Sequence, residues 1–273
     1  MDEIKPTEET IKYIQYLSEI LDFGTSELQT KVNSDKHSHL QNFLLFSFIP
    51  IHNYSEAILT LCKNSRPHAS NVLLRSIFEA YMNIMYVKST DTEKRLALFA
   101  KGSFKGREKL LKRFTELSIL YPHLKDKYAI LEKDNLISHK EFVDKHIQAI
   151  DLGNDLNEDD NYEEQLLERI KQIDKEAPKD KAGMNEFNYR TMYSLLSQYT
   201  HLSPWGLELF IKQGSKSIIY TLGQDVGGDE IIGQTYLFYF ELLLGLYENK
   251  VLSGEMPIVY RTWFDEFKKG ILK

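Results

Sequence analysis

The sequence predicts an all-α protein: one bundle of long antiparallel helices with a charged insert and at most a minor β-hairpin. Two observations predict this class. Apolar residues recur at helical spacing along most of the 273 residues, and the chain shows neither internal repeats nor an alternation of strands with helices. We expect a single domain, 1–273, with N-terminal helices over 1–38, core helices over 39–150 and 184–273, and the charged insert over 151–183.

Prolines and glycines set the element boundaries in the first half of the chain. Gly24 is expected to end the first helix, Pro50 to bend the second, and Pro67 to lie in the first turn of the third. Gly102 and Gly106 are expected to interrupt the fourth. The fourth helix is expected to be capped by Thr90 or Asp91 and to run through Lys94 to Leu120. The other helices predicted in this half cover residues 7–24, 39–64, 67–88, 123–134 and 138–150.

The second half begins with a strongly charged segment. Residues 155–181 carry ten acidic and five basic side chains and few large apolar ones. We predict a surface excursion or flexible insert there, with one exposed helix near residues 166–173. Residues 217–222 form the one convincing strand candidate. Helical spacing then predicts helices over residues 187–201, 204–210, 228–249 and 257–269.

Composition excludes several classes of protein. Hydrophobic residues make up 42% and aromatic residues 12%, which is too much for a disordered chain. The single cysteine, Cys62, excludes an intramolecular disulfide and a cysteine-based zinc cluster. The net charge of -6 argues against duplex-DNA specificity. A signal-peptide pattern is absent, and the longest apolar runs, residues 43–51 and 236–247, are too short to span a bilayer, so we expect a cytoplasmic protein without membrane contact.

One stretch of the chain reverses the overall negative charge. Residues 101–113 contain six basic side chains against one acidic residue, Glu108, which gives a local excess of five positive charges. Such a stretch is either a surface that faces RNA or an ordinary solvated helix face. The six basic residues are Lys101, Lys105, Arg107, Lys109, Lys112 and Arg113.

Polar side chains on otherwise apolar helices are the main functional signal. Three sets recur at four-residue spacing, which places the members of each set on one helix face. They are His52 with Glu56, Arg75 with Glu79, and Tyr193 with Ser197 and His201. Equal distances from the turn near residue 65 predict that Glu56 meets Arg75 and that His52 meets Glu79. The three sets are expected to form one buried cluster, which is either a functional site or a purely structural network.

These residues also resemble a known family. The pattern Arg-x3-Glu followed downstream by Tyr-x2-Leu-Ser-x3-His-x-Ser is similar to a bacterial all-helical family of unknown function. Here the pattern falls on Arg75 and Glu79, then on Tyr193, Leu196, Ser197, His201 and Ser203. The resemblance covers about residues 40–250 and implies an association with phage defence or abortive infection. It also implies a distant likeness to HEPN RNases.

The chain departs from the HEPN pattern at one position. HEPN RNases usually carry Arg-x4-6-His within one helix, whereas the arginine nearest before His201, Arg190, lies eleven residues upstream. The arginine would come from another helix, such as Arg75. Metal-independent RNA cleavage then needs His201 as the base and Arg75 as the cation, with Tyr193 and Ser197 positioning a phosphate. Glu79 and Glu56 would orient Arg75 or neutralise it.

Two other hypotheses remain open. The first is a dinuclear metal site, which has little support because Arg75 would place a cation among the carboxylates; no metal and no cofactor are expected. The second is a non-catalytic interaction or sensor module whose polar cluster fixes the helix register. In that case the aromatic-rich helix around residues 235–247 could pair two copies of the chain, so a homodimer is a hypothesis.

Overall fold

The computed structural model of the chain describes residues 7–32, 37–126, 165–200, 211–213, 218–220 and 228–271. The fold is all-α, as predicted. The chain divides into two compact units, one formed by residues 1–85 and 170–273 and the other by residues 86–169. The expected single domain stays a prediction.

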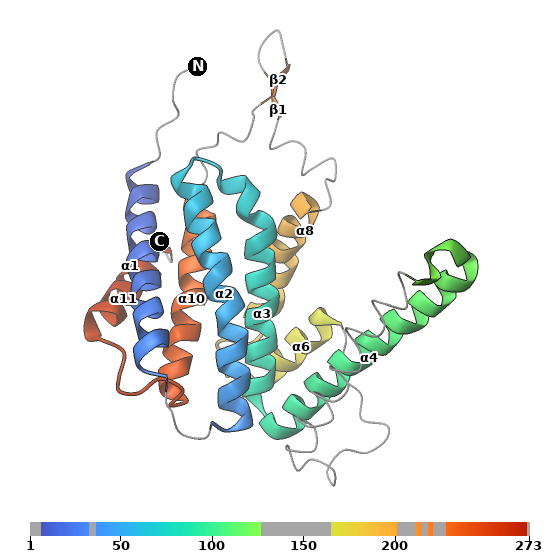
Figure 1. Ribbon diagram of the computed structural model, residues 1–273. Coiled ribbons are helices and arrows are strands. Elements are labelled where there is room, and N and C mark those ends of the chain that lie inside the picture. Colours follow the sequence, from blue (N-terminus) through green and yellow to red (C-terminus); the bar gives the residue numbers. More distant parts are fainter. Residues whose placement is uncertain are drawn as a thin grey trace. The chain divides into compact units, whose positions relative to one another are not determined.

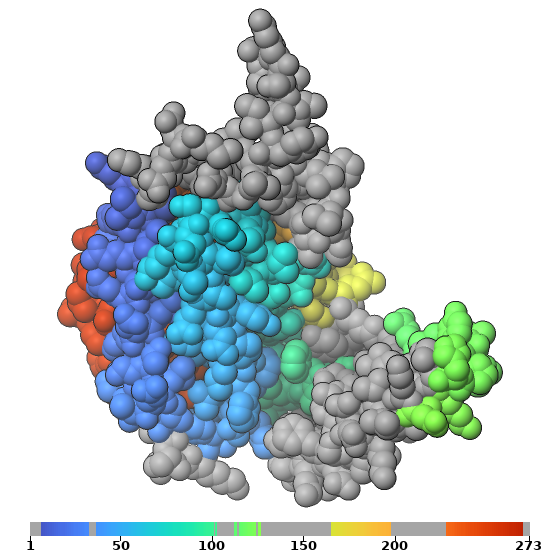
Figure 2. All heavy atoms as spheres, turned by 45° about the horizontal axis from the view of Figure 1, so that its top comes forward, coloured from blue at the N-terminus to red at the C-terminus, as the bar shows by residue number. Residues whose placement is uncertain are grey.

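The first unit is organised around one central helix, α10 (Asp229–Glu248). Thirteen of its twenty residues are buried, and α1 (Glu8–Thr30) and α2 (His39–Lys63) pack against it and against each other. Figure 1 shows α10 between α1 and α2, and Figure 2 shows α1 and α2 as the neighbouring blue surfaces. The helix α11 (Ile258–Ile271) stacks Phe264 on Phe240 of α10 at 4.0 Å between ring centroids.

The N-termini of these helices are capped by hydroxyl groups. Thr7 Oγ1 accepts from the Thr10 backbone N–H at 3.0 Å and also contacts Asp229, so the starts of α1 and α10 are joined. Ser38 and Gln41 form a reciprocal capping box at the start of α2. These caps confirm where α1 and α2 were predicted to begin.

The helix α1 does not end at Gly24, as the sequence suggested. Gly24 is buried inside α1, and a Cβ atom placed there would overlap the hydroxyl of Tyr239 on α10. The glycine therefore permits a close approach between two helices. Its role is in packing and not in terminating the helix.

The boundaries of the next helices agree with the prediction more closely. Pro50 lies inside α2, and a short 3-10 helix η1 (Pro67–Ser70) leads into α3 (Asn71–Ser89). The helix α4 (Thr92–Leu120) is continuous, so the predicted interruption at its two glycines is wrong. A glycine inside a helix costs about 1 kcal/mol, which a 29-residue helix tolerates. The short helix η2 (Pro122–Leu124) follows it.

The end of the charged segment is not an exposed excursion. The helix α6 (Leu166–Glu176) buries Ile170 and Ile173, because its few apolar residues share one face. Asp174, also buried, accepts from the backbone N–H groups of Asn185 at 3.2 Å and Glu186 at 2.8 Å and so caps the next helix. That helix runs as α7 (Met184–Asn188), a π-helical turn η3 (Tyr189–Tyr193) and α8 (Ser194–Thr200).

The predicted strand forms one half of a small antiparallel hairpin. The strands β1 (Ile211–Gln213) and β2 (Ile218–Tyr220) pair Ile211 with Tyr220. The helices predicted over 138–150 and 204–210 lie outside the described residues, as does most of 123–134. Within the residues that the structure describes, no helix combines the length and apolar character needed to cross a membrane.

Candidate functional site

Three side chains form a closed hydrogen-bonded cluster, the Arg75–Glu79–Tyr193 network. Arg75 and Glu79 lie one turn apart on α3, and Arg75 Nε donates to Glu79 Oε1 at 3.1 Å. From η3, the Tyr193 hydroxyl accepts from Arg75 Nη2 at 2.8 Å and donates to the same Glu79 oxygen at 2.7 Å. All three bonds involve a charged partner, and such bonds are stronger than neutral ones. The network therefore ties α3 to the segment formed by η3 and α8.

The network lies at the edge of the core and not in its interior. The side chain of Arg75 is 21% exposed and that of Glu79 is 41% exposed, so the predicted burial of this cluster is wrong. Aromatic rings pack against the network. The Arg75 guanidinium carbon lies 4.8 Å from the centroid of the Tyr193 ring, and the Tyr189 ring stacks on Tyr193 at 4.8 Å. Phe78 contacts Tyr193 at 5.8 Å between centroids.

The protonation states in this network follow from its contacts. Burial raises the pKa of Tyr193, and the hydrogen bond to Glu79 raises it further, while Arg75 acts in the opposite direction. The phenol is therefore neutral near pH 7. Burial lowers the pKa of Arg75, but Tyr193 and Glu79 outweigh that effect, so the net shift is upward. The site presents a permanent cation beside a neutral hydroxyl and a carboxylate.

The backbone at Tyr193 is unusual. Residues Tyr189–Tyr193 form a π-helical turn, a rare conformation that occurs often at functional sites. Ser197 lies one turn further along, in α8, but makes no hydrogen bond to Arg75, Glu79 or Tyr193. His201 follows the last residue of α8 and lies outside the described residues, so its place in the cluster stays a prediction.

His52 and Glu56 of α2 form a second network, which involves α1 and α10. His52 Nδ1 lies 2.7 Å from the Tyr239 hydroxyl of α10, and His52 Nε2 lies 3.2 Å from Thr25 Oγ1 of α1 and 3.4 Å from Glu56 Oε1. Thr25 donates its own hydroxyl to the Leu21 carbonyl, so it accepts from Nε2–H. The Tyr239 hydroxyl then donates to Nδ1, which describes a neutral imidazole.

The predicted pairs Glu56–Arg75 and His52–Glu79 are therefore wrong. Equal distances from a turn place two residues at one height on neighbouring helices, but they do not fix how each helix is rotated about its axis. His52 faces α1 and α10, whereas Arg75 faces η3. Burial lowers the pKa of His52, although Glu56 opposes that shift. This histidine is a satisfied core residue and not a part of the Arg75–Glu79–Tyr193 network.

The basic stretch lies on one continuous helix. Because α4 is uninterrupted, Lys101, Lys105, Lys109 and Lys112 follow spacings of four, four and three residues and share one stripe of the helix. Lys112 and the adjacent Arg113 are exposed, while the side chains of the other basic residues in the stretch lie outside what the structure describes. The basic stretch therefore lies on one uninterrupted backbone helix and not on the predicted broken one.

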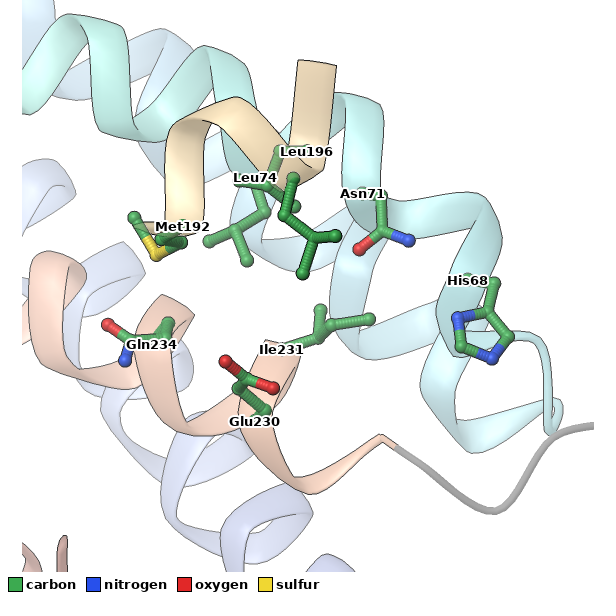
Figure 3. Close-up of a pocket in the computed structure, with 9 residues that line it drawn as sticks. His68, Asn71, Leu74, Met192, Leu196, Glu230, Ile231 and Gln234 are labelled. Carbon is green, nitrogen blue, oxygen red and sulfur yellow. The ribbon is translucent and has the colours of Figure 1, made fainter. Parts of the chain in front are cut away.

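The structure also contains a pocket that the sequence did not indicate. A space of about 90 Å³ opens between α3, η3–α8 and the start of α10 (Figure 3). Leu74, Leu196 and Ile231 provide apolar walls, and Figure 3 places Asn71 and Glu230 on opposite sides of the space. The remaining lining residues are His68, Met192, Leu195 and Gln234.

Polar side chains in this pocket are left without partners. Asn71 is only 3% exposed, and its Nδ2 atom has no hydrogen-bond acceptor among the described residues. Glu230 and Gln234 likewise make no side-chain hydrogen bond to any residue that the structure describes. A buried amide left unpaired costs about 1–3 kcal/mol, so an unused donor there calls for an explanation. In sequence, Asn71 and Glu230 look like ordinary residues at helix starts, and only the tertiary contacts bring them together.

Residues 41–218 match a family described as "Family of unknown function (DUF5677)". The chain belongs to the DUF5677 family. The matched residues include the whole Arg75–Glu79–Tyr193 network, which agrees with the predicted membership of a family of unknown function. They leave out α1, α10 and α11, so the matched part of this DUF5677 protein does not contain its central helix. Searches of curated proteins and of solved structures gave no match.

Among the described residues, no group of three or more His, Cys, Asp or Glu side chains is placed to hold a metal ion. Near α3 and η3, the network supplies a guanidinium, a phenol and a carboxylate. Together they can bind and polarise an anion such as a phosphodiester.

Proposed function

We propose that this protein is a bacterial defence or toxin-like effector that cleaves RNA without a metal ion. The observation that carries the proposal is the position of Arg75. It is a permanent cation at a partly open site, held by Glu79 and Tyr193 on a π-helical turn, and the segment after that turn leads to His201. The resemblance to defence-associated and HEPN-like proteins supports the same proposal.

The proposed reaction is an internal transesterification. His201 takes the proton from a ribose 2′-hydroxyl, the 2′-oxygen attacks the adjacent phosphorus, and the bond from phosphorus to the 5′-oxygen breaks. The leaving oxygen takes a proton from water, which gives a 2′,3′-cyclic phosphate and a 5′-hydroxyl. Arg75 stabilises the charge that develops on the phosphorane, and Tyr193 and Ser197 position the phosphate.

Glu79 has a positioning role in this proposal. Its carboxylate accepts from both Arg75 Nε and the Tyr193 hydroxyl, so it fixes the two groups relative to each other. Glu56 belongs to the His52 network and does not compete for Arg75.

The test compares wild type with Arg75→Ala for RNA cleavage in a buffer containing EDTA and for toxicity when expressed in bacteria. Arg190→Ala is the matched control, because Arg190 also pairs with a glutamate one turn away but is 62% exposed. We expect Arg75→Ala to lose at least a hundredfold in cleavage rate and to lose toxicity, with Arg190→Ala unchanged. Equal activity of wild type and a folded Arg75→Ala variant would refute the proposal.

The alternative is a non-catalytic interaction or sensor module, and one observation favours it. Two of the Arg75 nitrogens already donate within the network, so the arginine has a structural role in joining α3 to η3. On this alternative, Arg75→Ala lowers the melting temperature and neither protein cleaves RNA. The cleavage assay and a melting curve on the same samples separate the two functions.

A further inference from the structure

We propose that the pocket bounded by Asn71, Glu230 and Gln234 binds the edge of a nucleobase that presents an amino group beside a hydrogen-bond acceptor. The inference rests on the proposed function for its biological meaning, because it names which bases of an RNA strand the protein holds. It is carried by the pocket itself. Three polar side chains converge there without partners among the described residues.

The donors and acceptors of the pocket define the ligand. Asn71 Nδ2 is a buried donor that lacks an acceptor among the described residues, and Glu230 offers a carboxylate that can only accept. Because these two residues lie on opposite sides of the space, a ligand needs an acceptor on one side and an N–H group on the other (Figure 3). The base edges of cytosine, adenine and guanine satisfy this pattern, since each has an amino group. Uracil has no amino group, and its only ring N–H, at N3, lies between two carbonyl oxygens that the carboxylate would repel.

The apolar walls and the size fit a flat ring. Leu74, Leu196 and Ile231 can contact the two faces of a ring, which is the usual arrangement of ligand sites with a few placed polar groups. A cavity of about 150 Å³ encloses benzene, so a space of about 90 Å³ admits only the edge of a ring. Glu230 is exposed and opens one wall to water, which leaves room for the ribose outside.

The pocket adjoins the Arg75–Glu79–Tyr193 network. Both are built on α3 and on η3–α8: Leu74 precedes Arg75, and Met192 precedes Tyr193. A strand whose base enters the pocket therefore brings a neighbouring phosphate toward the arginine. The base would select the substrate, and the network would act on the backbone.

The experiment measures binding of cytidine, adenosine, guanosine and uridine to the full-length protein by titration calorimetry. We expect at least one nucleoside with an amino group to bind ten times more tightly than uridine. Glu230→Gln should remove most of that preference, because the amide no longer offers two acceptors. Glu8→Gln is the matched control, since Glu8 is also an exposed acid in the first turn of a long helix and lies outside the pocket.

Asn71→Ala provides the second variant. We expect it to weaken nucleoside binding at least tenfold without lowering the melting temperature, because the amide that it removes has no partner among the described residues of the folded protein. The exposed Asn53→Ala serves as its control. A purely structural Asn71 would instead lower the melting temperature and leave binding unchanged.

Three results would overturn the inference: no nucleoside binds, uridine binds as tightly as the best of the others, or neither pocket variant changes binding. The outcome is separate from that of the cleavage test. Nucleoside binding without RNA cleavage would leave the pocket assignment standing and remove the nuclease. RNA cleavage without nucleoside binding would leave the nuclease standing and remove the pocket assignment.

Discussion

The Tyr193 hydroxyl joins the two charged members of the candidate site. It accepts from Arg75 and donates to Glu79, and its raised pKa keeps the proton in place at neutral pH. Removing this one oxygen would leave Arg75 and Glu79 paired on α3 but without their hydrogen bonds to Tyr193 of η3. The hydroxyl therefore contributes to the link between two segments that lie more than a hundred residues apart in the chain.

Tyr193→Phe tests this role. The variant keeps the ring that contacts Arg75 and Phe78 and loses two hydrogen bonds, so we expect the free energy of unfolding to fall by about 0.5–1.5 kcal/mol. Urea denaturation measures that difference. Tyr189→Phe is the control, because Tyr189 stacks on Tyr193 but is not part of the network. A Tyr193→Phe variant as stable as the control would mean that the network contributes nothing to the fold.

His52 predicts a pH dependence of stability. Its pKa is lowered by burial below the ordinary value of 6.5, so the unfolded chain binds the proton more readily than the folded chain. The contribution of His52 to the free energy of unfolding is therefore fully present above pH 6.5. It is lost as the pH falls from 6.5 toward the folded-state pKa of His52. We expect His52→Gln to flatten the dependence of the urea midpoint between about pH 7 and pH 5. An unchanged slope in that variant would show that His52 does not carry the effect.

Pairs of residues within one helix could be predicted from the sequence better than pairs between helices. The four-residue spacing correctly placed Arg75 with Glu79 and His52 with Glu56. The pairings between helices depended on how each helix is rotated, which a spacing argument does not contain. Asn71 could not be identified at all, because its lack of a partner is a property of the packed structure.

At the scale of elements, the close approach of α1 and α10 depends on Gly24. Replacing a glycine at an exposed position inside a helix with alanine normally raises the free energy of unfolding by about 1 kcal/mol. At Gly24 the added Cβ would displace the Tyr239 ring, whose hydroxyl also binds His52. We expect Gly24→Ala to destabilise by about 1–3 kcal/mol in urea denaturation. The exposed Ser26→Ala on the same helix should change stability little, and a Gly24→Ala variant as stable as wild type would contradict the packing.

The basic residues of α4 predict a salt-dependent interaction with RNA. Lys112→Glu combined with Arg113→Glu should weaken binding of single-stranded RNA and reduce the slope of log K against log salt, by about 0.7 for each RNA phosphate that is no longer neutralised. Fluorescence anisotropy with a labelled oligonucleotide measures both. Lys179→Glu with Lys181→Glu makes the same charge change at exposed positions outside α4. Equal weakening in the two double variants would show a general charge effect and no surface specific to α4.

Element types and starts were predictable because apolar spacing and capping residues are local signals. Thr7, Ser38 and Pro67 each lie where a helix was expected to begin. Glycine was the least informative signal, since Gly24 and the two glycines of α4 lie within continuous helices. The burial of Ile170 and Ile173 in α6 was missed because the surrounding charge suggested a solvated segment.

At the scale of the molecule, the apolar character of α10 is explained within one chain. Its aromatic residues contact α1, α2, α3 and α11, so a second copy is not required to cover them. A homodimer stays a prediction, and the exposed apolar side chains of Phe46 and Ile49 on α2 are a better surface for it. Sedimentation of a single species with the mass of one chain, 31.9 kDa, at micromolar concentration would remove that prediction.

The chemistry of the cleavage products tests the proposed RNase activity most directly. Purified protein is incubated with a single-stranded RNA of mixed sequence in EDTA, and the fragment ends are identified by mass spectrometry. We predict fragments with 2′,3′-cyclic phosphate ends from wild type and a loss of at least a hundredfold in their rate for His201→Ala. Intact RNA with the folded wild-type protein, or fragments formed equally by His201→Ala, would contradict the proposed activity.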